Sequence, residues 1–173
     1  MTNFRKSMAN IKAFIFDVDG VLGSDKVWLH PNGEMLRTMN IKDGYAMQYA
    51  IRMGYKIAII SGGNSDSVKN RFFKLGIEDI FMKSQNKVED YSLFKTKYGL
   101  TDNEILYMGD DLPDYEVMQQ VGLPTCPASA IEEIKAISKY ISDKPGGEGA
   151  VRDIIQQVMR LHGKWMNKEN MNW

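Results

Sequence analysis

Ala13-Phe14-Ile15-Phe16-Asp17-Val18-Asp19-Gly20 is the stretch of sequence that decides the fold. Its first four residues are all apolar and rich in β-forming side chains, which is typical of a strand buried on both faces of a parallel sheet. Carboxylates and a glycine do not continue such a strand. The stretch therefore predicts a central strand over 13–16, with Asp17 and Asp19 at its carboxyl end.

Apolar runs and helical patterns alternate along the rest of the chain. Further strands are predicted at 56–60, 79–82, 105–108, 122–126 and 140–141. Apolar residues at helical spacing predict helices at 44–53, 65–75, 87–98, 114–121 and 149–162. This alternation predicts an α/β fold, a Rossmann-like parallel sheet with helices on both faces.

Residues 21–40 depart from that pattern. Asn32-Gly33 is a strong turn signal between Val27-Trp28-Leu29 and Glu34-Met35-Leu36, so we expect a β-hairpin excursion here. The hairpin occupies most of the chain between the first strand and the next helix. The later intervals hold only a helix and a strand each. The sequence therefore predicts a core without a cap domain.

Composition limits the function classes. The 173 residues are 43% hydrophobic and 25% charged, which predicts one domain over 1–173 with its core at about 11–162 and a tail at 163–173. Lys plus Arg and Asp plus Glu are 22 each, so bulk-charge binding to nucleic acid or membrane is disfavoured. A single cysteine, Cys126, no signal peptide and no membrane-spanning apolar run favour a cytoplasmic protein.

Polar residues follow several predicted strands, and the carboxyl ends of parallel strands meet at one edge of the sheet. The residues are Asp17, Asp19, Ser61, Gly62, Gly63, Lys87, Asp110 and Asp111. Clustered carboxylates are the hard oxygen ligands that Mg²⁺ prefers. A Ser hydroxyl, open backbone N–H groups at Gly62 and Gly63, and a Lys ammonium suit a phosphoryl group. Lys83 competes with Lys87 for that role.

This combination of groups is what phosphoryl transfer requires, because that reaction depends on positioning and charge neutralisation. A phosphoryl group beside Asp17 invites in-line attack by the carboxylate and an aspartyl-phosphate. Asp19, two residues later, could protonate the leaving oxygen and then deprotonate the attacking water.

The pattern Asp17-Val18-Asp19-Gly20-Val21-Leu22, then Ser61, Lys87 and Gly109-Asp110-Asp111-x-x-Asp114, resembles the four motifs of the haloacid dehalogenase superfamily, in its capless subclass. The resemblance implies that Asp17 is the nucleophile and Asp19 the general acid/base. It implies that Asp17, the Asp19 backbone carbonyl and Asp110 bind Mg²⁺. It further implies that Ser61, Gly62 and Lys87 bind the phosphoryl group, and that Asp111 and Asp114 orient the metal shell and Lys87.

Two other segments narrow the resemblance. Asn40–Tyr45 and Gly146–Asp153 are similar to segments of the 3-deoxy-D-manno-octulosonate 8-phosphate phosphatase family. That similarity implies a phosphorylated sugar-acid substrate, a place in lipopolysaccharide-sugar synthesis, and Asp43 and Arg152 as substrate-site residues. It also implies a homotetramer, with hairpins packed at its centre and the Gly-rich segment reaching a neighbour's active site. Asp43 is also an N-cap candidate for the helix that follows it.

Several alternatives stay open at this point. Relatives acting on the nine-carbon 2-keto-3-deoxynononate 9-phosphate are expected to carry Glu where this chain has Gly63, which favours the eight-carbon substrate. The eight-carbon enzymes often carry a basic residue there, so Gly63 departs from both patterns. Lys42 likewise stands where Arg is expected. A receiver-like signalling domain, a mutase and a catalytically idle tetramerising module are the other readings. Asp19 argues against the receiver-like domain. The absence of cap insertions argues against the mutase, and the complete set of catalytic residue types argues against the idle module.

Overall fold

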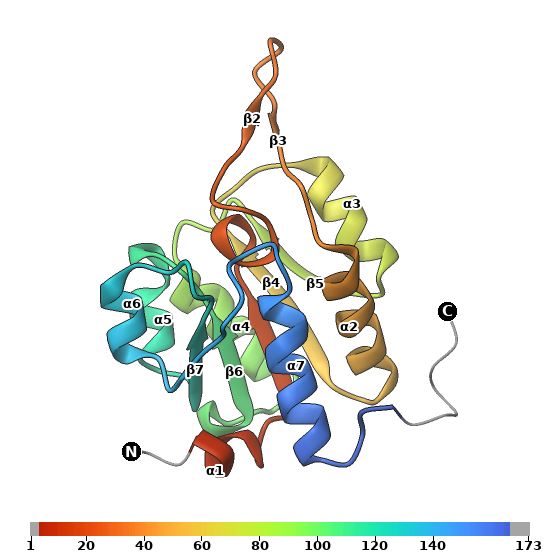
Figure 1. The fold of residues 1–173 in the computed structure, drawn as a ribbon, viewed down its shortest axis with the longest axis vertical. Helices are drawn as coiled ribbons and strands as arrows, with labels where there is room; N and C mark the ends of the chain where they lie inside the picture. Colours follow the sequence, from red (N-terminus) through yellow and green to blue (C-terminus); the bar gives the residue numbers. More distant parts are fainter. Residues whose placement is uncertain (1–3, 167–173) are drawn as a thin grey trace.

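The computed structural model describes residues 4–166, and its centre is a six-stranded parallel sheet (Figure 1). The strand order is β5-β4-β1-β6-β7-β8, so the predicted Rossmann-like parallel sheet is confirmed. The strands are β1 (Ala13–Phe16), β4 (Lys56–Ser61), β5 (Asp79–Met82), β6 (Ile105–Met108), β7 (Leu123–Cys126) and β8 (Tyr140–Ile141).

Helices cover both faces of this sheet, as the alternation predicted. They are α1 (Phe4–Met8), α2 (Ile41–Arg52), α3 (Asp66–Lys74), α4 (Lys87–Lys97), α5 (Tyr115–Met118), α6 (Glu132–Ile137) and α7 (Ala150–Leu161). Side chains of β1 point alternately to the two faces. Phe14 and Phe16 pack in one core with α2, α3 and α7, whereas Ala13 and Ile15 pack in the other with α4, α5 and α6.

The register of the sheet decides which loops meet. Phe16, the last residue of β1, pairs with Ile59 of β4 on one side and with Met108 of β6 on the other. The chain leaves β1 toward β4 first and reaches β6 later, so a topological switch point lies at the carboxyl end of β1. An irregular helical turn, η1 (Val18–Leu22), follows β1 at this point.

The expected hairpin is present as β2 (Trp28–Leu29) and β3 (Met35–Leu36), paired antiparallel. Gly33 has a φ of +90° in its turn, a conformation that glycine adopts without strain. The hairpin extends away from the body of the molecule (Figure 1). Its apolar side chains are exposed, with Trp28 at 72% and Leu29 at 79%.

Some boundaries differ from those predicted. Helix α2 begins at Ile41 because Asn40, not Asp43, caps it: the Asn40 side chain accepts a hydrogen bond from the Lys42 N–H at 2.8 Å. The helix expected at 114–121 splits into the turn η3 (Leu112–Asp114) and the short α5. Helices α1 and α6 were not predicted, although the acidic first turn of α6 and its isoleucines at i, i+3 signal a helix.

The expected tail lies partly outside the described residues, which end at 166. Within them, Trp165 packs edge-on against Tyr49 of α2, with ring centroids 5.5 Å apart. The part of the chain that the structure describes contains no helix long and apolar enough to cross a membrane.

Candidate active site

Asp17 follows β1 directly and is buried, with 8% of the residue exposed. Its Oδ1 accepts a hydrogen bond from the Val18 N–H at 2.6 Å, which caps η1 and fixes the carboxylate. The chain then turns at Gly20, where φ is +78°. A Cβ at position 20 would lie 1.9 Å from Asp110 Oδ2, so only glycine lets the two loops approach this closely.

Lys87 joins two carboxylates from different loops. It is the first residue of α4, and its Nζ lies 2.8 Å from Asp17 Oδ2 and 2.6 Å from Asp114 Oδ1. Asn86 sets the start of the helix by accepting hydrogen bonds from the first turn. The two ion pairs outweigh the effect of burial, and the pKa of Lys87 is raised. Lys87 is therefore a charged group at the centre of the site.

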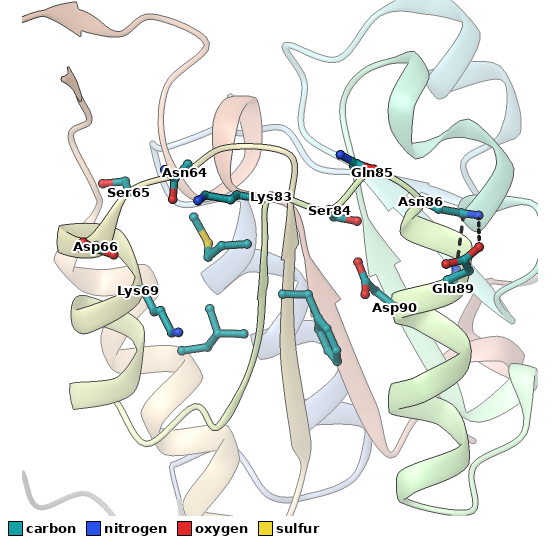
Figure 2. A pocket seen from close by; sticks show the side chains of 13 residues that line it. Asn64, Ser65, Asp66, Lys69, Lys83, Ser84, Gln85, Asn86, Glu89 and Asp90 are labelled. Carbon is teal, nitrogen blue, oxygen red and sulfur yellow. Dashed lines mark hydrogen bonds between the residues drawn. The ribbon is translucent and has the colours of Figure 1, made fainter. Parts of the chain in front are cut away.

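Lys83, the competing lysine, lies elsewhere. It is exposed on the loop after β5 and is directed toward Asn64 (Figure 2). It lines a separate cavity between α3 and α4, not the cavity that contains Asp17. The geometry therefore favours Lys87 over Lys83 as the lysine of the site.

Asp114 contacts both Lys87 and the backbone of Asp110. It is fully buried, and its Oδ1 accepts a hydrogen bond from the Tyr107 hydroxyl at 2.7 Å as well as from Lys87. Its Oδ2 accepts one from the Asp110 N–H at 3.2 Å. Carboxylate oxygens of Asp17, Asp110 and Asp114 lie within 4.8 Å of one another. Asp17 and Asp110 line the cavity, whereas Asp114 is fully buried beneath it, so Asp17 and Asp110 are better placed to hold a metal ion.

The electrostatics of this cluster fit a divalent cation. Burial, reinforced by the neighbouring carboxylates, raises the pKa of Asp17 and of Asp110 to about 7 each, and Lys87 opposes both shifts. A bound cation reverses this balance by stabilising the ionised carboxylates. The residues present therefore suit Mg²⁺, while the assignment of Asp17, Asp110 and the Asp19 backbone carbonyl as its ligands stays a prediction.

A pH-dependent metal effect follows from these pKa values. Both carboxyls ionise near 3.8 when unfolded and near 7 when folded and metal-free, so metal-free stability falls as pH rises between those values. Mg²⁺ needs the ionised forms. We expect Mg²⁺ to raise the thermal unfolding midpoint more at about pH 8 than at about pH 6. Asp110→Asn should lose most of this gain, and an equal gain at both pH values would contradict the prediction.

The predicted phosphate-binding side of the cavity comes from β4 and the loop after β5. Ser61 is buried, and its Oγ accepts a hydrogen bond from the Gly63 N–H at 3.1 Å. The expectation of an open N–H at Gly63 is therefore wrong, because the serine takes that donor. The cavity has a volume of about 520 Å³ and is lined by Asp17, Asp19, Gly20, Asp25, Ser61, Gly62, Gly63, Ser84, Gln85, Lys87, Asp110, Asp111 and Pro113.

Two of the expected substrate residues lie outside this lining. Asp43 is 1% exposed, and its Oδ1 accepts a hydrogen bond from the Arg152 N–H at 2.7 Å, so it caps α7 rather than its own helix. Burial raises the pKa of Asp43 to about 6. The guanidinium of Arg152 lies 5.4 Å from the Trp165 ring centre. Any contact of these residues with substrate stays a prediction.

The Gly-rich segment before α7 packs on the loop that follows β1 in the same chain. A Cβ at Gly146 would lie 1.7 Å from the Gly20 carbonyl oxygen, and the Gly147 N–H donates to the Val21 carbonyl at 2.8 Å.

Asp111 lines the cavity, and its Oδ1 accepts a hydrogen bond from the Leu112 N–H at 2.8 Å. Its expected influence on the metal shell stays a prediction.

The sequence motifs marked neither Arg37 nor the cavity-lining residues Asp25, Ser84, Gln85 and Pro113. Arg37 directly follows β3, and its guanidinium donates two hydrogen bonds to the carboxylate of Asp19. No motif or spacing marks Arg37 in the sequence, because the contact depends on the path of the chain as it returns from β3 toward the carboxyl end of β1.

Comparison with known proteins agrees with this geometry. The sequence model of the haloacid dehalogenase-like hydrolases matches residues 73–155. The 3-deoxy-D-manno-octulosonate 8-phosphate phosphatase of Salmonella typhi is 33% identical over 163 residues, which are 94% of this chain and 87% of the relative. The chain belongs to this phosphatase family.

Solved structures of the phosphatase family share the whole fold. The enzyme of Yersinia pestis aligns with a TM-score of 0.91 at 30% identity, over 94% of this chain and 88% of that chain. The enzyme of Moraxella catarrhalis aligns with a TM-score of 0.88 at 30% identity, over 93% and 92%. The Moraxella structure is a complex with a magnesium ion, a phosphate ion and a KDO molecule.

Proposed function

We propose that this protein is a Mg²⁺-dependent phosphatase that hydrolyses 3-deoxy-D-manno-octulosonate 8-phosphate to the free sugar acid and phosphate. The observation that carries the proposal is the Lys87 ammonium held between Asp17 and Asp114, in the cavity that Ser61 and Asp110 also line. A phosphate dianion finds there a nucleophile, a cation and a hydroxyl donor within one cavity.

In the first half of the reaction, the carboxylate of Asp17 attacks phosphorus, and the bond from phosphorus to the sugar oxygen breaks. Asp19 gives its proton to that leaving oxygen. Lys87 and the Ser61 hydroxyl hold oxygens of the transferring group. When bound, Mg²⁺ neutralises part of the phosphate charge.

In the second half, Asp19 takes a proton from water, and the water oxygen attacks the phosphorus of the aspartyl-phosphate. The bond between phosphorus and Asp17 breaks, which returns the Asp17 carboxylate and releases inorganic phosphate. The carboxyl of Asp19 lines the cavity with 39% of its side chain exposed, so it can meet both the leaving oxygen and the water.

The test is steady-state phosphate release with Mg²⁺ from the eight-carbon and nine-carbon sugar-acid phosphates. We expect kcat/KM to favour the eight-carbon substrate by at least about tenfold. The reason is that Gly63 lacks the Glu side chain expected at this position in relatives that act on the nine-carbon substrate. A nine-carbon preference would keep the mechanism and overturn the substrate. No release from either, by folded protein, would favour the idle-module reading.

The assembly we propose is a cytoplasmic homotetramer of single-domain chains. The exposed apolar side chains of the hairpin, Trp28, Leu29, Met35 and Leu36, are the surface that further copies would cover. We expect light scattering to give the mass of four chains, and Trp28→Glu to give a smaller species, because a buried charge would oppose association. A monomeric wild-type protein would contradict the proposal.

A further inference from the structure

The guanidinium of Arg37 donates a hydrogen bond to each carboxylate oxygen of Asp19. Arg37 Nε lies 2.6 Å from Asp19 Oδ1, and Nη2 lies 2.9 Å from Oδ2. A two-point contact between two planar groups fixes their relative orientation as well as their distance. The side chain of Arg37 is only 4% exposed and that of Asp19 is 39% exposed, so the guanidinium is covered while the carboxyl keeps a face open to the cavity.

A hydrogen bond to the hairpin also fixes the guanidinium of Arg37. Its third nitrogen, Nη1, donates to the Met35 carbonyl oxygen at 2.8 Å, within the hairpin itself. An antiparallel β-bridge between Gly23 and Met39 joins the two ends of the hairpin at its base. Each nitrogen of the guanidinium therefore has a partner. Because one of these partners lies in the hairpin and the other two are the oxygens of Asp19, the position of the hairpin base constrains the orientation of the Asp19 carboxyl.

Gly63 leaves room for this contact. A Cβ at position 63 would lie 3.2 Å from Arg37 Nη2 and 3.5 Å from Asp19 Oδ2. Any longer side chain would extend into the space that the guanidinium and the carboxylate share. The glycine in the phosphate loop and the arginine on the hairpin are thus sterically coupled.

We propose that Arg37 is a positioning residue that orients the Asp19 carboxyl for proton transfer, and that Gly63 is small in order to admit it. The inference rests on the proposed phosphatase function. A carboxyl that transfers a proton must direct its O–H at the leaving oxygen and later a lone pair at a hydrogen of the water, and a side chain that rotates freely spends much of its time misdirected. The contact removes that freedom from Asp19 and leaves it facing the cavity.

Three variants test the proposal. Arg37→Met keeps the aliphatic stem and removes every donor, whereas Arg37→Lys returns one charge without the two-point geometry. Lys26→Met, at an exposed position of the same segment, is the control for loss of a positive charge. Thermal unfolding of all three checks that the fold is kept.

Two substrates separate positioning from binding. One is the sugar-acid phosphate, or another alkyl phosphate that the wild type hydrolyses, and the other is para-nitrophenyl phosphate, whose leaving group needs no proton. For Arg37→Met we expect kcat on the alkyl phosphate to fall about tenfold or more, with KM changed less than about threefold. We expect kcat/KM for para-nitrophenyl phosphate to stay near the wild-type value, because it covers only the steps through cleavage of that bond. Arg37→Lys should recover part of the loss.

A double-mutant cycle with Asp19→Asn gives the decisive result. If Arg37 acts through Asp19, Arg37→Met should cause no further loss in the Asp19→Asn background. Additive losses, or a raised KM with unchanged kcat, would overturn the proposal and make Arg37 a direct substrate contact. Failure of the substrate assignment is seen separately, as wild-type protein that releases phosphate from para-nitrophenyl phosphate but not from the sugar acid.

Discussion

Asp17→Asn is expected to lower phosphate release by about 10⁴-fold or more while the protein stays folded. The amide has nearly the shape of the carboxylate but is not a nucleophile toward phosphorus, so no aspartyl-phosphate forms. Stability should be kept or improved, because Asp17 is buried beside Asp110 and Asp114, and burial and those charges already raise its pKa to about 7. Lys87 retains its pair with Asp114.

The measurement is kcat for Asp17→Asn alongside its thermal unfolding midpoint. Asp66→Asn, the same change at an exposed position at the start of α3, is the matched control and should retain wild-type turnover. Turnover of Asp17→Asn within about tenfold of wild type would refute the assignment of Asp17 as nucleophile.

Lys87→Met should have the second large effect, on both activity and stability. The loss of the ammonium leaves the carboxylates of Asp17, Asp114 and Asp110 without the lysine that offsets their charge. Removing one partner of a buried ion pair costs about 3–5 kcal/mol. Activity should fall by at least about 10²-fold, because one cation that neutralises the transferring group is gone.

The sign of the pH dependence distinguishes this cause from a packing defect. Without Lys87, the pKa values of Asp17 and Asp110 should rise further above about 7, since that lysine opposes their upward shift. Destabilisation by Lys87→Met should therefore be largest above that pH and shrink as the carboxyls become protonated below it. Urea unfolding on both sides of neutrality, without metal, measures the difference.

Lys83→Asn is the matched control for Lys87→Met. It removes the same charge four residues earlier, at an exposed position whose φ of +58° asparagine tolerates. We expect little change in activity or stability. If both variants were equally destabilised at every pH, the charge-cluster explanation would be wrong.

Much of the fold could be predicted because the local signals agreed with the tertiary structure. The run from Ala13 to Phe16 was long enough and apolar enough to be a central strand, and Asn32-Gly33 marked the hairpin turn. Helix starts were less certain. Asn40 and Asp43 are both good capping residues, and only the hydrogen bonds of the folded chain show that Asn40 caps α2 while Asp43 caps α7.

The sequence by itself determined the parallel sheet, the order of the motifs and the residue types at the ends of its strands, because these depend on local apolar patterns and on a general property of parallel sheets. Only the tertiary structure decided that Lys87 rather than Lys83 joins Asp17 to Asp114, and that Arg37 grips Asp19. Those contacts join residues far apart in the chain. Their geometry depends on the register of β1 with its neighbours and on the path of the hairpin, which no local pattern of residues encodes.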